Sequence, residues 1–383
     1  MTAAAVIYLP TASDAAVAAH TVAGRPVVFR AIASAVRGGA TRVYVPAAFG
    51  PGLGPALAAA PRVARAITWL NAGTPAPGGA LLVPATAVLG PGAITAMRLA
   101  PPPAVHAASH DAGTPVVGTD AATLAPLWPA LVAGAPIGDA LAKIAAAAPL
   151  VRDPSLFQRV RDGASAAAAE RRLYATLGSA IDTRLDTAFH RRFSRLVSRV
   201  AVARGITPNT ITLASLLLGL GAAWCFWQAT AAGAVAGLVV YALAVILDHA
   251  DGEIARLTLT ESAVGEWLDV GADTLTHVAI VLALGAASGA VTGRGTALGV
   301  VAALGFVASA AVAKAWPGIV MPDRVGTAIS GLGNRDGFYA MLIGFIAARA
   351  VLPEALPWLM IVVAAGAHAF WVGRVLYRVA RGA

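Results

Sequence analysis

Hydrophobic residues are distributed unevenly along the 383-residue chain. From residue 210 onward, apolar runs are long enough to cross a bilayer, which takes about 20 helical residues. Residues 1–150 instead contain short apolar runs that glycine and proline interrupt. The pattern predicts a soluble domain at 1–150, a linker with a juxtamembrane helix at 151–205 and a membrane domain at 206–383. In that last domain we expect six transmembrane helices, the fifth of them short: 210–228, 232–256, 266–288, 294–315, 337–352 and 356–377.

The soluble part alternates between strand-like and helix-like segments. Residues 3–9 and 42–47 have the pattern of buried strands, and 26–36 between them has that of a helix. A second helix is predicted at 55–70 and a strand-like run at 80–89. Such alternation is typical of an α/β sheet of the Rossmann type.

A separate helix is predicted just before the membrane domain. Its apolar residues recur at helical spacing, while its arginines lie off that stripe. We interpret it as an amphipathic helix in the headgroup region; the alternative is a helix packed on the soluble domain. Thr207 and Pro208 then form an N-cap and a first helical position. The stripe consists of Phe189, Phe193, Leu196, Val197 and Val200.

Composition and charge support a membrane protein. Only 12% of the residues are charged, against about 25% in soluble domains. The net charge is +9, and eleven arginines fall between Arg152 and Arg204. Arginines beside a span indicate a cytoplasmic segment and attraction to anionic lipid rather than nucleic-acid binding. With six spans, both termini and the loops containing Arg256, Arg324 and Arg335 would then face the cytoplasm, in a protein of the cytoplasmic membrane.

Two further features limit the chemistry. Cys225 is the only cysteine, which excludes an intramolecular disulfide and a site with several thiolate ligands. Residues 1–19 lack the basic start of a secretory signal, so we expect the soluble domain to stay in the cytoplasm.

Four aspartates stand out in the second and third predicted spans. Asp248 and Asp251 are three residues apart, and Asp269 and Asp273 are four apart, so each pair shares a helix face. The link between the two helices, about 257–264, is short. The two faces should therefore meet near the cytoplasmic ends of an antiparallel pair.

Carboxylates in that position need a partner. Each costs roughly 2.5–3.5 kcal/mol at a span centre, and neighbouring carboxylates also repel one another. Divalent cations remove both problems, and oxygen ligands without His or Cys favour Mg²⁺, Mn²⁺ or Ca²⁺ over zinc.

Small residues lie close to the aspartates. Gly252, Ala255 and Gly265 permit close helix packing and also leave room for a flat ligand. Arg256, at the cytoplasmic end, is placed to contact phosphate; the alternative interpretation is a positive-inside anchor.

Together these residues form the pattern Asp-x2-Asp-Gly-x2-Ala-Arg-x8-Gly-x3-Asp-x3-Asp. It resembles the defining motif of the CDP-alcohol phosphotransferases, which transfer a substituted phosphate from a CDP-linked donor to an alcohol and release CMP. The resemblance covers about 185–383 and implies an enzyme of lipid metabolism, commonly a homodimer. By this resemblance, Asp248, Asp251 and Asp269 should bind two divalent metals, Mg²⁺ or Mn²⁺. Asp273 should be the catalytic base and is also a candidate metal ligand.

The resemblance also implies substrate contacts. Gly252, Ala255 and Gly265 should line the CDP pocket with Arg256, and Asn209, in the segment with which many members begin, should join them. Lys314 and Arg335 are candidates for an anionic acceptor such as a polyol or inositol phosphate, or else side chains that reach to the interface. CDP-diacylglycerol is the expected donor because a membrane site suits entry of a lipid from the bilayer.

The soluble domain resembles a sugar-phosphate nucleotidyltransferase. Gly24-Arg25-Pro26 is similar to that family's Gly-Lys-Pro turn, but the expected Gly-x-Gly-x-Arg loop is replaced by residues 9–13, and no aspartate lies near 85. Without those glycines the phosphates lose a backbone cradle. We therefore expect a degenerate, inactive nucleotidyltransferase-like domain.

Two other functions remain open from the sequence. The first is a CDP-inositol-dependent synthase fused to a working cytidylyltransferase, which the missing glycine loop disfavours. The second is a divalent cation transporter, because paired intramembrane aspartates also mark ion paths.

Overall fold

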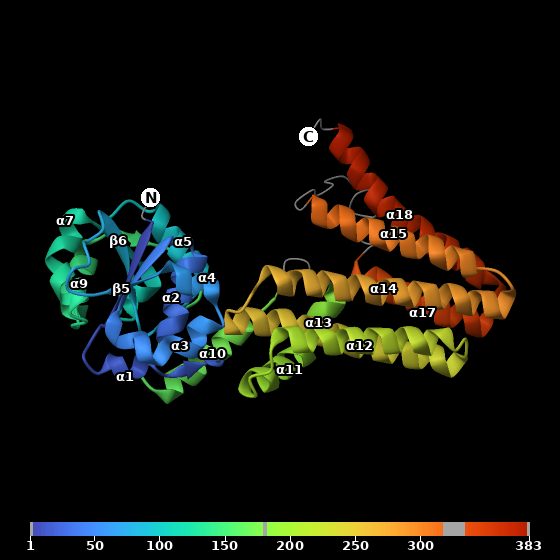
Figure 1. The fold of residues 1–383 in the computed structure, drawn as a ribbon, viewed down its shortest axis with the longest axis horizontal. Helices are drawn as coiled ribbons and strands as arrows, with labels where there is room; N and C mark the ends of the chain where they lie inside the picture. The colour runs from blue at the N-terminus through green and yellow to red at the C-terminus, as the bar shows by residue number, and fades with distance from the viewer. Residues whose placement is uncertain (1–2, 179–181, 317–333, 381–383) are drawn as a thin grey trace. The chain divides into compact units, whose positions relative to one another are not determined.

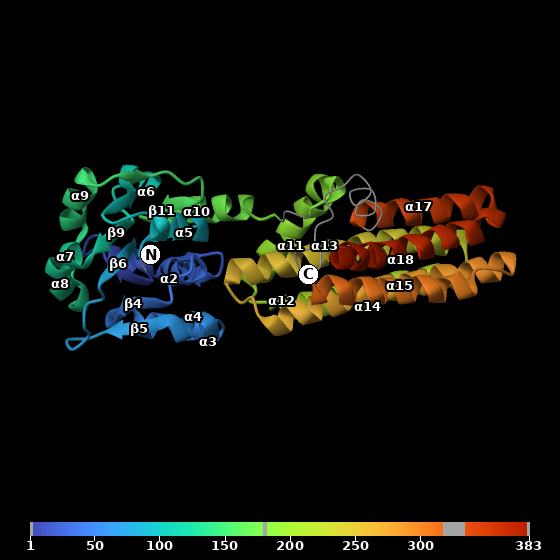
Figure 2. The same cartoon turned by 90° about the horizontal axis from the view of Figure 1, so that it is seen from above.

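The fold was analysed in a computed structural model, which describes residues 3–178, 182–316 and 334–380. The chain divides into two compact units. The first is Met1–Leu177 with Arg256–Thr260, and the second is Gly178–Ala255 with Glu261–Ala383. Each unit is drawn in Figures 1 and 2.

The first unit contains a mixed seven-stranded sheet in the order β10-β8-β9-β6-β1-β4-β5. Strand β9 runs antiparallel to β6 and β8, and the other pairs are parallel. Two-stranded ribbons join β2 to β3 and β7 to β11. The strands are β1 (Ala4–Tyr8), β2 (Thr21–Val22), β3 (Arg25–Pro26), β4 (Arg42–Pro46), β5 (Ile67–Leu70), β6 (Gly79–Pro84), β7 (Ala87–Leu89), β8 (Ala104–His106), β9 (Val117–Asp120), β10 (Leu150–Val151) and β11 (Phe157–Arg159).

Helices cover both faces of this sheet (Figure 1). Successive side chains of a strand point to opposite faces: in β1, Ala5 and Ile7 pack with α2, whereas Val6 and Tyr8 pack with α8 and α9. The helices are α1 (Asp14–Ala18), α2 (Val27–Arg37), α3 (Gly50–Ala58), α4 (Pro61–Ala66), α5 (Pro91–Leu99), α6 (Ala107–Asp111), α7 (Ala121–Leu124), α8 (Trp128–Val132), α9 (Gly138–Ala147) and α10 (Gly163–Ala175), with 3₁₀ turns η1 (Ala47–Phe49) and η2 (Ala125–Leu127).

The predicted α/β class is confirmed, but one predicted helix is wrong in part. Residues 55–70 form the end of α3, then α4, then the strand β5. Pro61 has no amide hydrogen to continue a helix and begins α4 instead. The β-branched and aromatic residues Ile67, Thr68 and Trp69 favour a strand, and β5 pairs with β4.

The second unit is helical. A π-turn, η3 (Asp186–His190), leads into α11 (Arg191–Ala203). The long helices that follow are α12 (Pro208–Trp227), α13 (Ala231–Thr258), α14 (Ala263–Thr292), α15 (Thr296–Ala315), α17 (Arg335–Val351) and α18 (Leu356–Ala380), with the 3₁₀ turn η4 (Pro353–Ala355) before α18.

Five of these helices are long and apolar enough to cross a membrane, among the described residues. They correspond to the first four predicted spans and the last. The predicted fifth span corresponds to α17, which has 17 residues, so six spans are not confirmed and the sixth stays a prediction. The outward side chains of the bundle are apolar and exposed, as contact with lipid requires; they include Leu217, Trp224, Leu304, Trp358 and Val362.

The juxtamembrane helix has two different faces. Phe189, Phe193 and Leu196 on its apolar stripe are exposed, which fits a helix lying in the headgroup region. The opposite face, with Ser194 and Ser198, is buried against α13. Thr207 caps α12 by accepting from the amide of Thr210, as the sequence predicts.

Helices α14 and α15 pack through glycine. A Cβ atom on Gly285 would lie 2.6 Å from the Cα of Gly299 and 3.2 Å from the carbonyl oxygen of Gly295. Neither neighbour is a flexible side chain. The backbones can therefore approach this closely only because both positions lack a side chain.

Gly285→Ala should consequently destabilise the membrane unit by about 1–3 kcal/mol, because the new methyl group forces two backbones apart. The check is the thermal unfolding midpoint in detergent. Gly344→Ala is the matched control: its Cβ meets nothing within 4 Å, and Ala is favoured in a helix by about 1 kcal/mol. Equal midpoints for both variants would contradict the packing argument.

Candidate functional site

The four motif aspartates lie on α13 and α14. Ser262 caps α14 by accepting from the amide of Gly265, 3.0 Å away, and this fixes where the helix starts. The carboxylates of Asp248, Asp251, Asp269 and Asp273 are close enough for their charges to interact. The predicted meeting of the two pairs is therefore present in the structure.

Asp251 is the most enclosed of the four, with 4% of its surface exposed. The hydroxyl of Thr212, on α12, lies 2.5 Å from Asp251 Oδ2 and donates to it. A hydrogen bond to one carboxylate oxygen fixes the direction in which the other oxygen faces. Sequence reasoning missed Thr212, because its partner lies 39 positions away.

Asp248 is paired with a cation. Arg335 Nη2, at the start of α17, donates to Asp248 Oδ2 over 2.7 Å. This places a predicted acceptor-binding residue directly beside the motif. A guanidinium at a carboxylate offsets its charge in an environment of low dielectric constant.

Asp273 is the most open of the four, with 49% of its side chain exposed. His277, one turn later, has Nδ1 at 3.3 Å from Asp273 Oδ1 and at 2.8 Å from the Asp273 carbonyl oxygen. The other ring nitrogen lies 3.2 Å from the hydroxyl of Tyr241. Asp273 is thus accessible from outside the cluster, and its side-chain partner is a histidine rather than an arginine.

The candidate CDP-binding residues are only partly brought together. A Cβ atom on Gly265 would lie 3.4 Å from Asn209 Oδ1, so these two residues are neighbours and a larger side chain at 265 would crowd the asparagine. Gly252 and Ala255 lie on α13 with the aspartates. Arg256 lies in the last turn of α13, in the segment that belongs to the first unit.

Lys314 has local partners on α14. Its ammonium forms an ion pair with Glu266 and lies 4.8 Å from the ring centre of Trp267, within cation–π range. A role for Lys314 in acceptor binding stays a prediction. It would require the Lys314 ammonium to contact the acceptor as well as Glu266.

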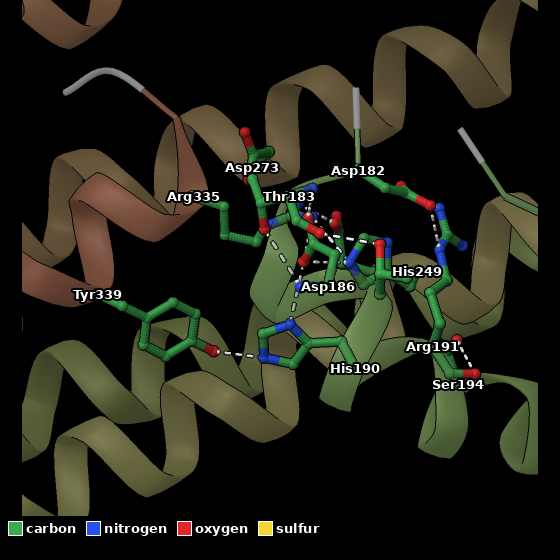
Figure 3. Close-up of polar contacts among 12 residues, drawn as sticks. Asp182, Thr183, Asp186, His190, Arg191, Ser194, His249, Asp273, Arg335 and Tyr339 are labelled. Atoms are coloured by element: carbon green, nitrogen blue, oxygen red, sulfur yellow. Dashed lines mark hydrogen bonds and ion pairs between the residues drawn. The ribbon is translucent and has the colours of Figure 1, made fainter. Parts of the chain in front are cut away.

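A second polar cluster adjoins the motif, and sequence reasoning missed most of it (Figure 3). Asp186 Oδ1 lies 3.0 Å from His190 Nδ1 and 2.8 Å from His249 Nε2. His190 Nε2 lies 2.9 Å from the hydroxyl of Tyr339. Asp186, His190 and His249 are all buried, and their ligand atoms lie within 4.8 Å of one another, so they could hold a metal ion.

Asp186 is ionised in this setting. Burial raises its pKa, but the hydrogen bonds from His190 and His249 and the amide of Thr183, together with the charge of Arg335, outweigh burial and hold the pKa well below its ordinary value. Only His249 of this cluster falls within the motif, at a position that the motif leaves variable.

A third group joins α11 to α13. Glu253 is fully buried and accepts from Arg191 Nη1 at 2.9 Å and from the hydroxyls of Ser194 and Ser198 at 2.8 and 2.7 Å. Arg191 also donates through Nε and Nη2 to Asp182, at 2.9 and 2.6 Å. A charge buried this deeply is stable only with such partners.

The motif carboxylates fit hard divalent cations. Their donor atoms are all carboxylate oxygens, and Thr212 orients one of them, which is the ligand set that Mg²⁺ or Mn²⁺ prefers. Among the described residues they do not form a group as tight as that of Asp186, His190 and His249. Like charges repel, and Arg335 binds one member of the set.

Comparison with known proteins gives one family. Residues 205–371 match the family of the CDP-alcohol phosphatidyltransferases, and the match contains every fixed position of the motif as well as Arg335. This family consists of transferases that act on a CDP-linked donor and an alcohol acceptor, and its members generally use divalent metal ions. No curated protein matches the chain.

Thr212→Val should weaken Mn²⁺ binding about 10-fold or more, because the candidate ligand Asp251 loses the hydrogen bond that orients it. The measurement is Mn²⁺ titration of the purified protein by isothermal calorimetry. Ser215→Ala, one turn along α12, is the control: its hydroxyl donates only to the Ala244 carbonyl, 2.9 Å away. If both variants bind Mn²⁺ like the unaltered protein, Asp251 does not contribute to a metal site.

Proposed function

We propose that this chain, which belongs to the CDP-alcohol phosphatidyltransferase family through residues 205–371, transfers a phosphatidyl group from CDP-diacylglycerol to an alcohol and releases CMP. The observation that supports it most is the gathering of all four motif aspartates within the matched segment. We include in the proposal a cytoplasmic-facing site in the cytoplasmic membrane and a homodimeric enzyme.

The proposed metal ligands are Asp248, Asp251 and Asp269, with Asp273 as a further candidate. Two divalent cations, Mg²⁺ or Mn²⁺, would neutralise the donor's diphosphate and the charge that develops on the leaving CMP. Around them, Thr212 holds Asp251 in orientation, and Asn209 and Gly265 border the place proposed for CDP.

Asp273 is the proposed base. The acceptor's hydroxyl oxygen forms a bond to the phosphatidyl phosphorus while the bond from that phosphorus to the CMP oxygen breaks, and the hydroxyl proton passes to Asp273. Its half-exposed position allows an alcohol to reach it. A base must lie within hydrogen-bond reach of the proton that it takes, and an enclosed residue such as Asp251 offers less access.

An anionic acceptor, such as a polyol or inositol phosphate, suits the arginine beside this site. Arg335 has 22% of its side chain exposed and lies at the motif. Guanidinium groups bind phosphate by two parallel hydrogen bonds. When Asp248 binds a cation, Arg335 would be able to turn one edge to the acceptor's phosphate.

We propose that the first unit does not synthesise a nucleotide-linked donor. In the loop after β1, the carboxylate of Asp14 accepts from the amide and hydroxyl of Thr11, at 3.0 and 2.9 Å. An amide used in this way cannot hold a phosphate, and a carboxylate beside it repels one. At the end of β6, a buried Thr86 follows Ala85, where the nucleotidyltransferase resemblance calls for a metal-binding aspartate.

The test is CMP release by the purified protein in lipid with Mn²⁺, CDP-diacylglycerol and a panel of alcohols. Acceptor-dependent release should fall at least 100-fold in Asp273→Asn, because the amide cannot take the proton. CDP binding, and Mn²⁺ binding through Asp248, Asp251 and Asp269, should persist in this variant. If the unaltered protein releases no CMP with any alcohol in the panel and its CDP binding is undetectable, the proposal is contradicted and a cation transporter is favoured.

A further inference from the structure

We propose that Asp186 is a positioning residue for the reaction proposed above, on which this inference rests: it holds Arg335 away from full pairing with Asp248, so that Asp248 remains available to a metal ion. Asp186 lies outside the motif, in the turn that precedes the juxtamembrane helix. It acts through Arg335 and does not itself touch substrate.

The guanidinium of Arg335 bridges two anions (Figure 3). Its Nη2 donates to Asp248 Oδ2 at 2.7 Å, while its Nη1 lies 3.5 Å from Asp186 Oδ1 and 2.9 Å from His249 Nε2. The two nitrogens of one planar group thus face opposite partners. A change in the contacts of Nη1 with Asp186 and His249 therefore alters the contact of Nη2 with Asp248.

The position of Asp186 is fixed from several directions. Its Oδ2 accepts from the amide of Thr183 at 3.0 Å, and its Oδ1 faces both His190 and His249. His190 is in turn held by Tyr339 of α17, the helix that carries Arg335. Only 1% of Asp186 is exposed, so water does not compete for these contacts.

The histidine contacts are alternatives. Arg335 can only donate, so its contact with His249 Nε2 requires that nitrogen to accept, whereas the contact with Asp186 requires the same nitrogen to donate. Only one of the two is a hydrogen bond at a time. Arg335 Nη1 therefore always has a second acceptor on this side, either His249 or Asp186.

This arrangement matters because Arg335 and a metal ion compete for Asp248. An arginine with a single anionic partner would bind that partner fully, and a cation would have to displace it. A second buried anion keeps the guanidinium neutralised while Asp248 turns to the metal. Asp186 supplies that anion without adding a fifth carboxylate to the motif.

A metal ion on Asp186, His190 and His249 is the competing interpretation. The guanidinium of Arg335 argues against it, because its Nη1 lies 2.9 Å from one of the three ligand atoms. A bound cation would face this positive group at close range and be repelled. The experiment below treats a metal at this cluster as an outcome that overturns the proposal.

The chain also offers a matched control. Glu253 joins the same juxtamembrane segment to α13 through Arg191, Ser194 and Ser198, and these contacts do not involve Arg335. Glu253→Gln removes a buried carboxylate charge from the same helix pair. If Mn²⁺ affinity falls only because α11 packs less firmly on α13, it should fall equally in Glu253→Gln.

The experiment is a double-mutant cycle with Mn²⁺ affinity as its readout, measured by calorimetry on the full chain in lipid. Asp186→Asn should weaken Mn²⁺ binding about 10-fold. Losses of this size are typical when a residue that supports a metal ligand is removed. Arg335→Gln should bind Mn²⁺ at least as well as the unaltered protein. The double variant should match Arg335→Gln, because Asp186 acts through the arginine. Glu253→Gln should stay within about two-fold of the unaltered protein.

Three results would overturn the proposal. If Asp186→Asn weakens Mn²⁺ binding equally in the unaltered protein and in the Arg335→Gln variant, Asp186 acts independently of Arg335. If Glu253→Gln weakens Mn²⁺ binding as much as Asp186→Asn does, the role of Asp186 is only to dock the juxtamembrane segment on α13. Loss of one bound metal equivalent in both Asp186→Asn and His190→Gln would place a metal on the cluster instead.

Two additions keep the test decisive. If Asp186→Asn does not fold, Tyr339→Phe removes only the hydroxyl that holds His190 and should weaken Mn²⁺ binding in the same direction, by less. The binding cycle needs no turnover. A coupled cycle in a protein that releases no CMP contradicts the proposed function alone, whereas CMP release with an uncoupled cycle contradicts only the role of Asp186.

Discussion

The membrane unit is organised around the cost of placing four carboxylates between apolar helices. Each would be unfavourable alone, and together they repel one another. The structure treats them differently. Asp251 receives a hydroxyl from α12, Asp248 receives an arginine from α17, and Asp273 is left half exposed. The positions of α12 and α17 relative to the motif helices therefore follow from the charges they must satisfy as well as from apolar packing.

Two faces of helix α13 carry polar residues, and each face has different contacts. The fixed positions of the motif, Asp248 and Asp251, face the other aspartates, whereas the variable positions His249 and Glu253 contact the juxtamembrane segment. These last two are four residues apart and so lie on one face. The variable positions of the motif thus provide a surface for docking the juxtamembrane segment. In this chain, His249 and Glu253 each form a buried polar cluster there.

The sequence predicted the elements whose signal is periodic, and it predicted the motif. Spacings of three and four residues place the aspartates on helix faces without any knowledge of the fold. The contacts of Asp186 were beyond such reasoning, because His249 is 63 and Arg335 is 149 positions away and no period links them. For the same reason Arg191 looked like one of several surface arginines, although it is buried. The error at 55–70 has a non-local cause as well, because residues 67–70 form the strand β5 by pairing with β4.

The exposure of the aspartates also gives the proposed site a direction. Asp251 is 4% exposed, and the side chain of Asp273 is 49% exposed, so the proposed site opens from the candidate ligand Asp251 toward Asp273, the proposed base. A donor held by its diphosphate needs the enclosed end, where hydrogen bonds and charges are strongest. An alcohol that must enter and then lose a proton needs the open end. The order of the motif along α14, ligand first and base one turn later, supports this arrangement, with Arg335 at the side where an acceptor's phosphate would lie.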